Sequence, residues 1–424
     1  MPYGGGLFVN AQRFNIRRRL SLLLLSLPMW SRLQVARATT FNPSPARFGW
    51  EEVGQVDRVR ILWAADAALG MAPVTIVKTA SPLSPGNVND YYSNGDYWWP
   101  NPASADGLPY VRRDGQSNPG NFNDHRLAVR ALRDAVAALA AAALILKSDP
   151  RAPKYLEKMA QLLAVFFVHP NTRMNPHLQY AQAIPGVSQG RGIGIIDTLH
   201  LIEIPVALEA ISGLPGLPMA VATGVQDWFR TYLQWLTSSA NGQDEAKERN
   251  NHSVAYWLQV AVFARFTRDK ARMAQVVEQF KRNFIGTQMA LDGSFPEELK
   301  RTKPYAYSLF QLDNMAALCQ VLSTPAENLW DFRLPDGRSM EKGLAYVAPY
   351  IANKSQWPYA PDVQAWQYWP MRQSALLFGG NVFARGDWLQ LWSRLQPDSA
   401  DDEVQRNIAI TQPILWLKTQ TSGV

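Results

Sequence analysis

Residues 127–147 read LAVRALRDAVAALAAAALILK, a run made almost entirely of Ala, Leu, Val and Ile. These residue types favour a helix, and apolar side chains on most of its faces indicate that the helix is buried. Asn123, a few residues upstream, is of a type that caps helix N-termini. The run therefore predicts a core in which helix packs on helix.

Helical periodicity returns throughout the rest of the chain. It is found at about 153–168, 197–212, 218–238, 251–267, 269–284, 305–322 and 339–353, with shorter pieces near 371–378 and 386–395. No comparable series of alternating strand patterns is present, and no self-similarity at a fixed period favours a solenoid. We predict an all-α fold over residues 123–424, an (α/α) toroid or incomplete barrel of about five to seven helical hairpins.

The first 122 residues divide into two parts, neither of which is predicted to belong to the toroid. Residues 1–38 resemble an export signal, with Arg17, Arg18 and Arg19 before an apolar run and Ala36-Arg37-Ala38 as a cleavage site. The paired arginines favour twin-arginine export, with ordinary secretion as the alternative, so we predict a periplasmic or secreted protein. Residues 39–122, rich in Pro, Gly, Asn and aromatic residues, are predicted to form an irregular N-terminal arm packed on the toroid.

Charge and cysteine content restrict the kinds of partner. The chain has a net charge of +7, but six arginines and no acid lie in residues 1–38, and removing these six charges leaves +1. Attraction to an acidic polymer must then come from a local basic cleft, and we expect no nucleic-acid partner. The single cysteine permits no internal disulfide, and no later apolar stretch is long enough to span a membrane.

The segment Glu245-Ala-Lys-Glu-Arg-Asn250-Asn251-His252 opens a predicted helix. Two amides and an imidazole at a helix start add side-chain donors to backbone N–H groups that already favour an anion, and the segment suits a carboxylate. The alternative is that Asn250 or Asn251 only caps the helix and that His252 satisfies a buried neighbour.

A second cluster lies at 292–310. Arg301 supplies a permanent positive fork for a carboxylate, and Tyr307 supplies a phenol that can move a proton if nearby cations lower its pKa. An ordinary core tyrosine is the alternative for Tyr307.

Two further clusters are rich in amides, cations and aromatic rings. Arg173 and Gln182 lie in one that forms either a structural turn or a cleft wall. In the other, Tyr97 and Trp98 are candidates to stack on sugar rings, and Arg112 or Arg113 to bind uronate carboxylates, although an aromatic arm clamped on the core explains these residues equally well.

Taken in order, the strings YWWP, GLPYVRRDG, TRMNP, YAQAIPG, NNHS and ELKRT resemble the alginate lyase superfamily of (α/α) toroid polysaccharide lyases. The resemblance runs from about Asp90 to Tyr350 and is nearest to polysaccharide lyase family 38, which contains alginate and glucuronan lyases. It differs from family 5 in the tyrosine motif, which here reads AYSLF.

The resemblance implies β-elimination on a β-1,4-linked uronic acid polymer, alginate or glucuronan. Asn251 and Arg301, helped by Gln182, would neutralise the C6 carboxylate, and Tyr307 would protonate the leaving O4. Tyr307 would also be the base for mannuronate or glucuronate, and His252 would be the base for guluronate. Glu245 would orient His252 or Arg301.

No metal or other cofactor is expected, because the five histidines include no close pair at ligand spacing. Two other functions stay open. A glycoside hydrolase would need two carboxylic acids, for which Asp197 with Glu203, or Asp292 with Glu297, are candidates. A non-catalytic uronan-binding protein would need only the aromatic arm and the arginines.

Overall fold

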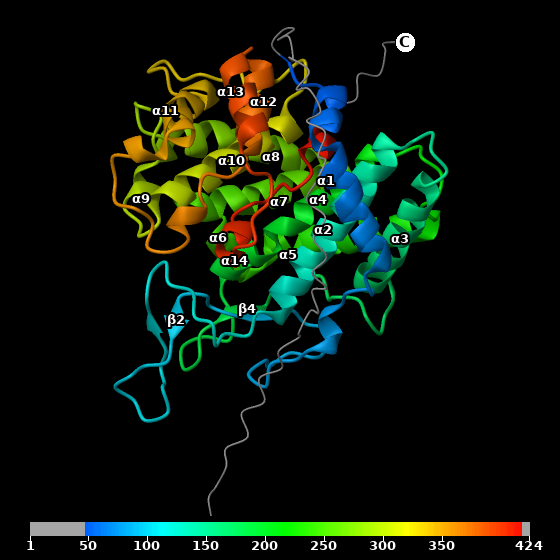
Figure 1. Cartoon of the computed structure of the whole chain (residues 1–424). Helices are drawn as coiled ribbons and strands as arrows, with labels where there is room; N and C mark the ends of the chain where they lie inside the picture. Colours follow the sequence, from blue (N-terminus) through cyan, green and yellow to red (C-terminus); the bar gives the residue numbers. More distant parts are fainter. Residues whose placement is uncertain (1–46, 418–424) are drawn as a thin grey trace, which may run out of the picture. The chain divides into compact units, whose positions relative to one another are not determined.

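The computed structural model describes residues 47–417, so the predicted export segment, residues 1–38, lies outside the described residues. The apolar run forms helix α2 (Asp124–Ile145), which is buried on most faces as predicted. It packs against α1 (Trp50–Gly70) and α3 (Ala152–Leu163) (Figure 1). Asn123 occupies the N-cap position of α2, but its side chain makes no capping hydrogen bond.

Five helices with most of their residues buried form an inner row, in which each contacts the next along the chain. They are α2, α4 (Glu203–Ala210), α7 (Asn251–Thr267), α10 (Pro304–Leu322) and α12 (Ser374–Val382). Outside this row lie helices that bury one face only. They are α1, α3, α5 (Met219–Ser238), α8 (Lys270–Gln279), α11 (Met340–Ala352) and α13 (Gly386–Arg394). This alternation of outer and inner helices is the arrangement of an (α/α) toroid, and the predicted all-α class is confirmed.

The predicted helical segments correspond closely to observed helices where the apolar pattern is strong. The segment 251–267 is α7, and 305–322 differs from α10 by one residue. The segment 197–212 is instead a 3-10 helix (Gly192–Ile202) followed by α4, and 153–168 and 269–284 each end in π-helical turns. Three short helices, α6 (Ala240–Glu245), α9 (Pro296–Leu299) and α14 (Asp402–Arg406), lie in connections. Among the described helices, none is both long and apolar enough to cross a membrane.

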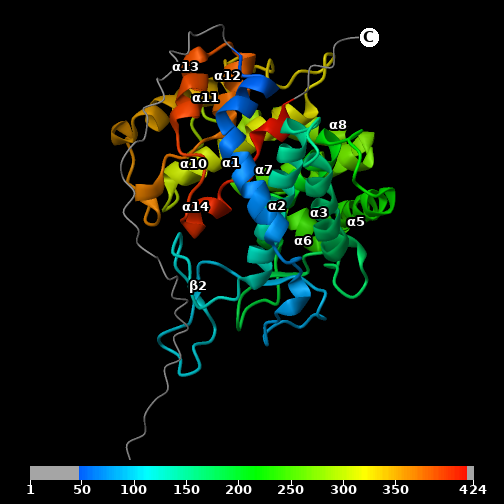
Figure 2. The same cartoon turned by 45° about the vertical axis from the view of Figure 1, so that its right-hand side comes forward.

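Two small sheets lie at one end of the helical rows, where α14 also lies (Figures 1 and 2). In the first, β1 (Tyr92–Asn94) pairs in parallel with β4 (Tyr180–Ala183). In the second, β2 (Trp98–Trp99) pairs antiparallel with β3 (Val111–Arg112). We call residues 71–122, which carry β1 to β3, the arm loop.

The prediction that residues 39–122 are irregular is wrong for α1. Its buried stripe contains Val53, Asp57, Ile61 and Ala65, which are spaced four residues apart as a helix requires. The acidic Asp57 interrupts the apolar pattern, and the stripe was therefore not recognisable from hydrophobicity. In the fold Asp57 is paired with Arg60 at 3.0 Å and with Arg372 at 2.5 Å, which allows it to be buried.

The C-terminal segment is held against α4 by one buried carboxylate. Glu203 is 0% exposed. One of its oxygens accepts hydrogen bonds from the Thr411 N–H at 2.8 Å and hydroxyl at 2.6 Å, and the other accepts from the Gln412 N–H at 3.0 Å. The segment Pro413–Trp416 thus packs beside α1, α2 and α4. α14, which precedes it, is joined to the arm loop through contacts of Arg406 with Asp96 and Tyr97.

Replacing Glu203 with Ala is expected to lower the free energy of unfolding by about 3 kcal/mol, because buried donors lose their acceptor. Urea unfolding measures this change. Glu341→Ala is the control, since Glu341 is 42% exposed in its pair with Arg333 and should change stability by less than about 0.5 kcal/mol. Equal stability of the Glu203 variant and the native protein would contradict the anchoring role.

Candidate functional site

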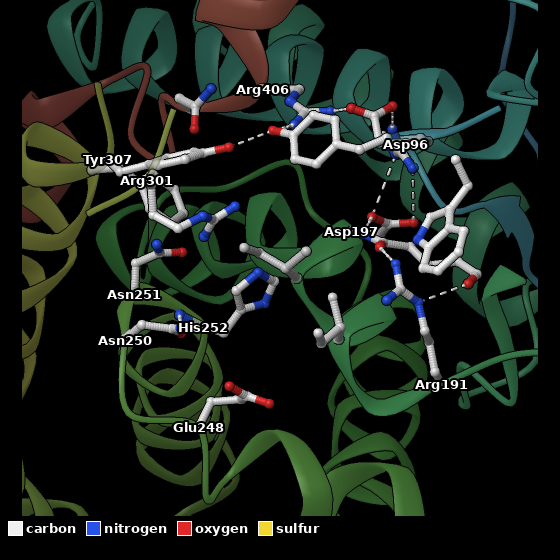
Figure 3. A pocket seen from close by; sticks show the side chains of 18 of the residues that line it. Asp96, Arg191, Asp197, Glu248, Asn250, Asn251, His252, Arg301, Tyr307 and Arg406 are labelled. Carbon is white, nitrogen blue, oxygen red and sulfur yellow. Dashed lines mark hydrogen bonds and ion pairs between the residues drawn. The ribbon is translucent and has the colours of Figure 1, made fainter. Parts of the chain in front are cut away.

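A polar cavity of about 360 Å³ opens at the end of the helical rows that carries the two sheets. Its walls come from separate parts of the chain: the arm loop, α2, the segment from β4 to the 3-10 helix, the start of α7, the start of α10, and α14. Figure 3 shows the side chains that face it. Among the residues that line the cavity are Tyr97, Trp98, Arg112, Gln182, Arg191, Asp197, Asn250, Asn251, His252, Arg301, Tyr307 and Arg406.

The start of α7 places three of the predicted residues at this cavity. Asn250 is the N-cap, and its side chain accepts a hydrogen bond from the His252 N–H at 3.0 Å. The Asn251 backbone and side-chain amides both donate to the buried carboxylate of Glu298, at 2.7 and 2.5 Å. These contacts fix the amides of Asn251. Asn250 both caps α7 and lines the cavity, so its two predicted roles do not exclude each other.

His252 is oriented by Glu245. The His252 Nδ1 lies 2.8 Å from the Glu245 Oε1, and Nε2 has no hydrogen-bond partner among the described residues. Although burial lowers the pKa of His252, the charge and hydrogen bond of Glu245 raise it above its ordinary value. Glu245 is 1% exposed and does not line the cavity. Glu245 thus contacts His252, one of the two residues that it was expected to orient, and is not itself placed to touch substrate.

Arg301 joins the helical rows to the arm loop. Its Nε and Nη2 donate to the two carboxylate oxygens of Asp114 at 3.2 and 2.9 Å, and Thr302 donates to the same group at 3.0 Å. Burial raises the pKa of Asp114, but the hydrogen bond and charge of Arg301 outweigh it and lower that pKa to about 2. The guanidinium carbon lies 4.6 Å from the centre of the Tyr307 ring.

Tyr307 is 5% exposed, and its hydroxyl lies 2.6 Å from that of Tyr97. Burial raises the pKa of Tyr307 above its ordinary value, although Lys303, Arg301 and the hydrogen bond from Tyr97 lower it. The expectation that cations would bring the pKa of Tyr307 below its ordinary value is thus wrong, because desolvation is the larger effect.

The Tyr97 hydroxyl has a defined proton direction. Its oxygen accepts from Lys303 Nζ at 2.9 Å and from Arg406 Nη2 at 2.6 Å, and neither cation has a lone pair to offer in return. With both acceptor positions filled, the Tyr97 proton is left for the Tyr307 oxygen. Burial is the largest cause that raises the pKa of Tyr97 well above its ordinary value, so Tyr97 keeps its proton.

Gln182 lines the cavity with its side chain held by protein groups. Its Nε2 donates to Asp197 at 3.0 Å, its Oε1 accepts from Arg191 at 2.9 Å, and its φ of 49° lies in the left-handed region. The β1–β4 pairing stabilises this strained residue through a hydrogen bond from the Gln182 N–H to the Ser93 hydroxyl at 2.8 Å.

The structure separates two predicted residues from the others. Arg173 is exposed and does not line the cavity; its carbonyl accepts from Asn89 at 2.7 Å. Arg113 is also exposed, with its guanidinium 4.7 Å from the centre of the Trp99 ring. Both were predicted to bind substrate from local composition, which does not reveal where a side chain points. Arg112, the alternative to Arg113, does line the cavity, as do Tyr97 and Trp98.

Several residues of the site were missed. Glu298 and Lys303 lie within a recognised cluster, but both are 0% exposed and act through their contacts with Asn251 and Tyr97. Lys303 is also paired with Glu403, far along the chain. Arg191 and Arg406 belong to no string that the sequence singled out, and Asp197 was considered only as a hydrolase acid; the fold shows that all three line the cavity.

No group of three or more His, Cys, Asp or Glu side chains able to hold a metal ion is found within residues 47–417. The walls of the cavity present a phenol, an imidazole, amides, guanidinium groups and carboxylates.

Comparisons with known proteins agree with this geometry. Residues 76–357 match the family model described as alginate lyase. Among solved structures, the chain is similar to the crystal structure of an alginate lyase from Bacteroides ovatus, with a TM-score of 0.74 and 29% sequence identity over 84% of this chain and 93% of that one. No curated protein sequence matches the chain. Because the family model covers more than half of the residues and includes every wall of the cavity except α14, the chain belongs to the alginate lyase family.

Proposed function

We propose that the protein cleaves a β-1,4-linked uronic acid polymer, mannuronate-rich alginate or glucuronan, by β-elimination. Membership of the alginate lyase family supports a polysaccharide lyase acting on an acidic polysaccharide. The observation that carries the proposal is that Asn251, His252, Arg301 and Tyr307 line one cavity. We also propose, from the predicted signal in residues 1–38, that the enzyme acts outside the cytoplasm.

The first requirement of the reaction is to make the C5 proton of the uronate acidic. Asn251 and Arg301, with the first turn of α7, are placed to hold the C6 carboxylate and the negative charge that develops on it. Since Asp114 fixes the Arg301 guanidinium through Nε and Nη2, Nη1 is left without a partner among the described residues. The donors are thus oriented before substrate arrives.

Proton transfer is assigned to Tyr307. For mannuronate and glucuronate, where the C5 hydrogen and O4 lie on the same side, an ionised Tyr307 takes the C5 proton. The C5–H electron pair then forms the C4=C5 double bond, the C4–O4 bond breaks, and Tyr307 returns its proton to O4. The product has a 4,5-unsaturated non-reducing end. Tyr97 supports this cycle, because its O–H donates to the Tyr307 oxygen and stabilises the ionised form.

His252 is the candidate base for guluronate, where the C5 hydrogen and O4 lie on opposite sides. Glu245 holds Nδ1, so Nε2 is the ring nitrogen that remains for substrate. Because Glu245 raises the pKa of His252, the neutral imidazole that would act as the base forms at a higher pH than it would for an unpaired histidine.

The carboxylates proposed for a hydrolase do not form a suitable pair. Glu203 is fully buried and holds the C-terminal segment, and Asp197 accepts hydrogen bonds from Tyr91, Ser93 and Gln182. Asp292 and Glu297 are exposed and lie outside the cavity. We therefore favour elimination over hydrolysis.

The reaction class is tested by incubating the protein with polymannuronate, polyguluronate and glucuronan while recording ultraviolet absorbance of the new double bond. Tyr307→Phe should reduce the rate at least ~100-fold, because the acid–base group is removed, and should leave polymer binding largely intact. Tyr368→Phe, at a tyrosine that is 47% exposed, is the control and should not change the rate. Reducing ends formed without the absorbance would show hydrolysis, and an active Tyr307→Phe protein would remove Tyr307 from the chemistry.

Tyr97→Phe tests the proton direction deduced above. Loss of the Tyr97 hydroxyl removes a hydrogen bond that lowers the pKa of Tyr307, so that pKa rises further. If Tyr307 must ionise first, the rise of activity with pH should move to higher pH by about one unit, with about 10-fold lower turnover at neutral pH. An unchanged pH profile, equal to that of Tyr359→Phe at an exposed tyrosine, would contradict the assignment.

A further inference from the structure

The cavity has two cationic walls. Arg301 lies on one side with Asn251 and Tyr307, and Arg191 lies on the opposite side (Figure 3). The chemistry proposed above uses only the first wall. Arg191 comes from the segment between β4 and the 3-10 helix, which the sequence motifs did not include.

Arg191 differs from the other arginines of the cavity in its charge balance. The others each pair with a carboxylate: Arg112 with Asp114 at 2.6 Å, Arg126 with Asp96 at 2.9 Å, Arg301 with Asp114 at 2.9 Å, and Arg406 with Glu403 at 2.9 Å. In the described part of the chain, no carboxylate lies within 4.0 Å of the Arg191 guanidinium. A half-buried guanidinium without an ion-pair partner loses hydration free energy that no paired carboxylate restores. An anionic ligand would offset this loss.

The Arg191 side chain is nevertheless held firmly by neutral groups. Its Nε donates to the Gln182 carbonyl at 3.1 Å, and its Nη2 donates to the Gln182 side chain at 2.9 Å. Nη1 has no hydrogen-bond partner among the described residues. The backbone is equally confined, because a Cβ at Gly190 would lie 2.1 Å from the Gln179 carbonyl oxygen and one at Gly192 would lie 2.7 Å from that of Asn241.

Two neighbours of Arg191 indicate the class of ligand. Trp98 lines the cavity with its ring centre 5.8 Å from the Arg191 guanidinium carbon, and an indole face is a surface on which sugar rings stack. Arg112 adds a second positive charge. Burial lowers the pKa of Arg191, with Asp197 opposing this and Arg112 adding to it, so an incoming carboxylate would be favoured.

We propose that Arg191, beside Trp98 and Arg112, binds the carboxylate of a second uronate, next to the one whose carboxylate meets Asn251 and Arg301. This inference rests on the proposed function and adds a specificity to it. The enzyme then requires two neighbouring acidic sugars, and an isolated uronate in a neutral chain is a poor substrate.

Binding tests the subsite without turnover. In a Tyr307→Phe background, the Kd values of mannuronate and glucuronate tetramers and of their neutral counterparts, β-1,4-mannotetraose and cellotetraose, are measured by calorimetry. Arg191→Gln should weaken binding of the acidic tetramer that the protein prefers by about 10-fold or more, and should leave the neutral tetramers unchanged. Arg191→Lys should recover part of the loss, and Arg113→Gln, at an exposed arginine outside the cavity, should behave like the background protein.

Three results would overturn the subsite. The first is that the Arg191→Gln protein binds the acidic tetramers as tightly as the background protein does. The second is an equal loss of affinity for acidic and neutral tetramers, and the third is the same loss of affinity in Arg113→Gln. Absence of double-bond formation by the native protein on every polyuronate would instead reject the proposed reaction. The binding result would still decide the role of Arg191.

Turnover gives a second readout on polymer whose carboxylates have been reduced at random. If two neighbouring carboxylates are needed, the rate of the native protein falls as the square of the fraction of carboxylates that remain. It is then about one quarter of the original rate when half of the carboxylates remain. For Arg191→Gln the rate falls in direct proportion, to about one half. The same dependence in both proteins would contradict a second carboxylate site.

Discussion

The ion pair between Asp114 and Arg301 connects the two parts of the molecule that form the cavity. Asp114 belongs to the arm loop and Arg301 to the segment before α10, and two hydrogen bonds fix their relative orientation. Arg301 in turn lies against the ring of Tyr307, whose hydroxyl meets Tyr97 from the arm loop. Without this pair, the Arg301 guanidinium would lose the two hydrogen bonds that orient it.

Burial of charge explains the rest of the site. Charges that are buried in the walls of the cavity are removed from water, so each of them needs a partner. Glu298 accepts hydrogen bonds from the amides of Asn251, one oxygen of Glu245 contacts His252, and Lys303 is paired with Glu403. These partners orient the groups that face substrate, and Arg191 stands out because no such carboxylate accompanies it. The same constraint places Glu203 and Asp57 in structural roles in the core.

The sequence predicts the helices well where their apolar stripes are continuous. α7 and α10 are buried on most faces, and their bounds follow from composition alone. α1 was missed because Asp57 lies on its buried stripe, and its burial depends on Arg372, more than three hundred residues away. The π-helical ends of two predicted helices have no distinct residue pattern, since they result from packing.

In the functional site, local motifs predict those residues that lie together at the start of a helix. Asn250, Asn251 and His252 could be recognised because a cap, an amide and an imidazole at one N-terminus suit an anion. Arg173 and Arg113 were predicted from the same kind of local composition, but the fold turns them outward. Lys303, Arg406 and Arg191 depend on contacts between distant segments, and a single sequence contains no signal for such contacts.

We propose that one cavity holds the uronate acid group between Asn251 and Arg301, with O4 of the same sugar at Tyr307. A crystal structure of the Tyr307→Phe protein with a bound mannuronate or glucuronate tetramer tests it most directly. We expect a C6 carboxylate within hydrogen-bond distance of Asn251 and Arg301, with O4 of the same sugar facing the ring at position 307. A tetramer bound elsewhere, for example in the groove lined by Lys247, Trp257 and Gln279, with the cavity left empty, would contradict it.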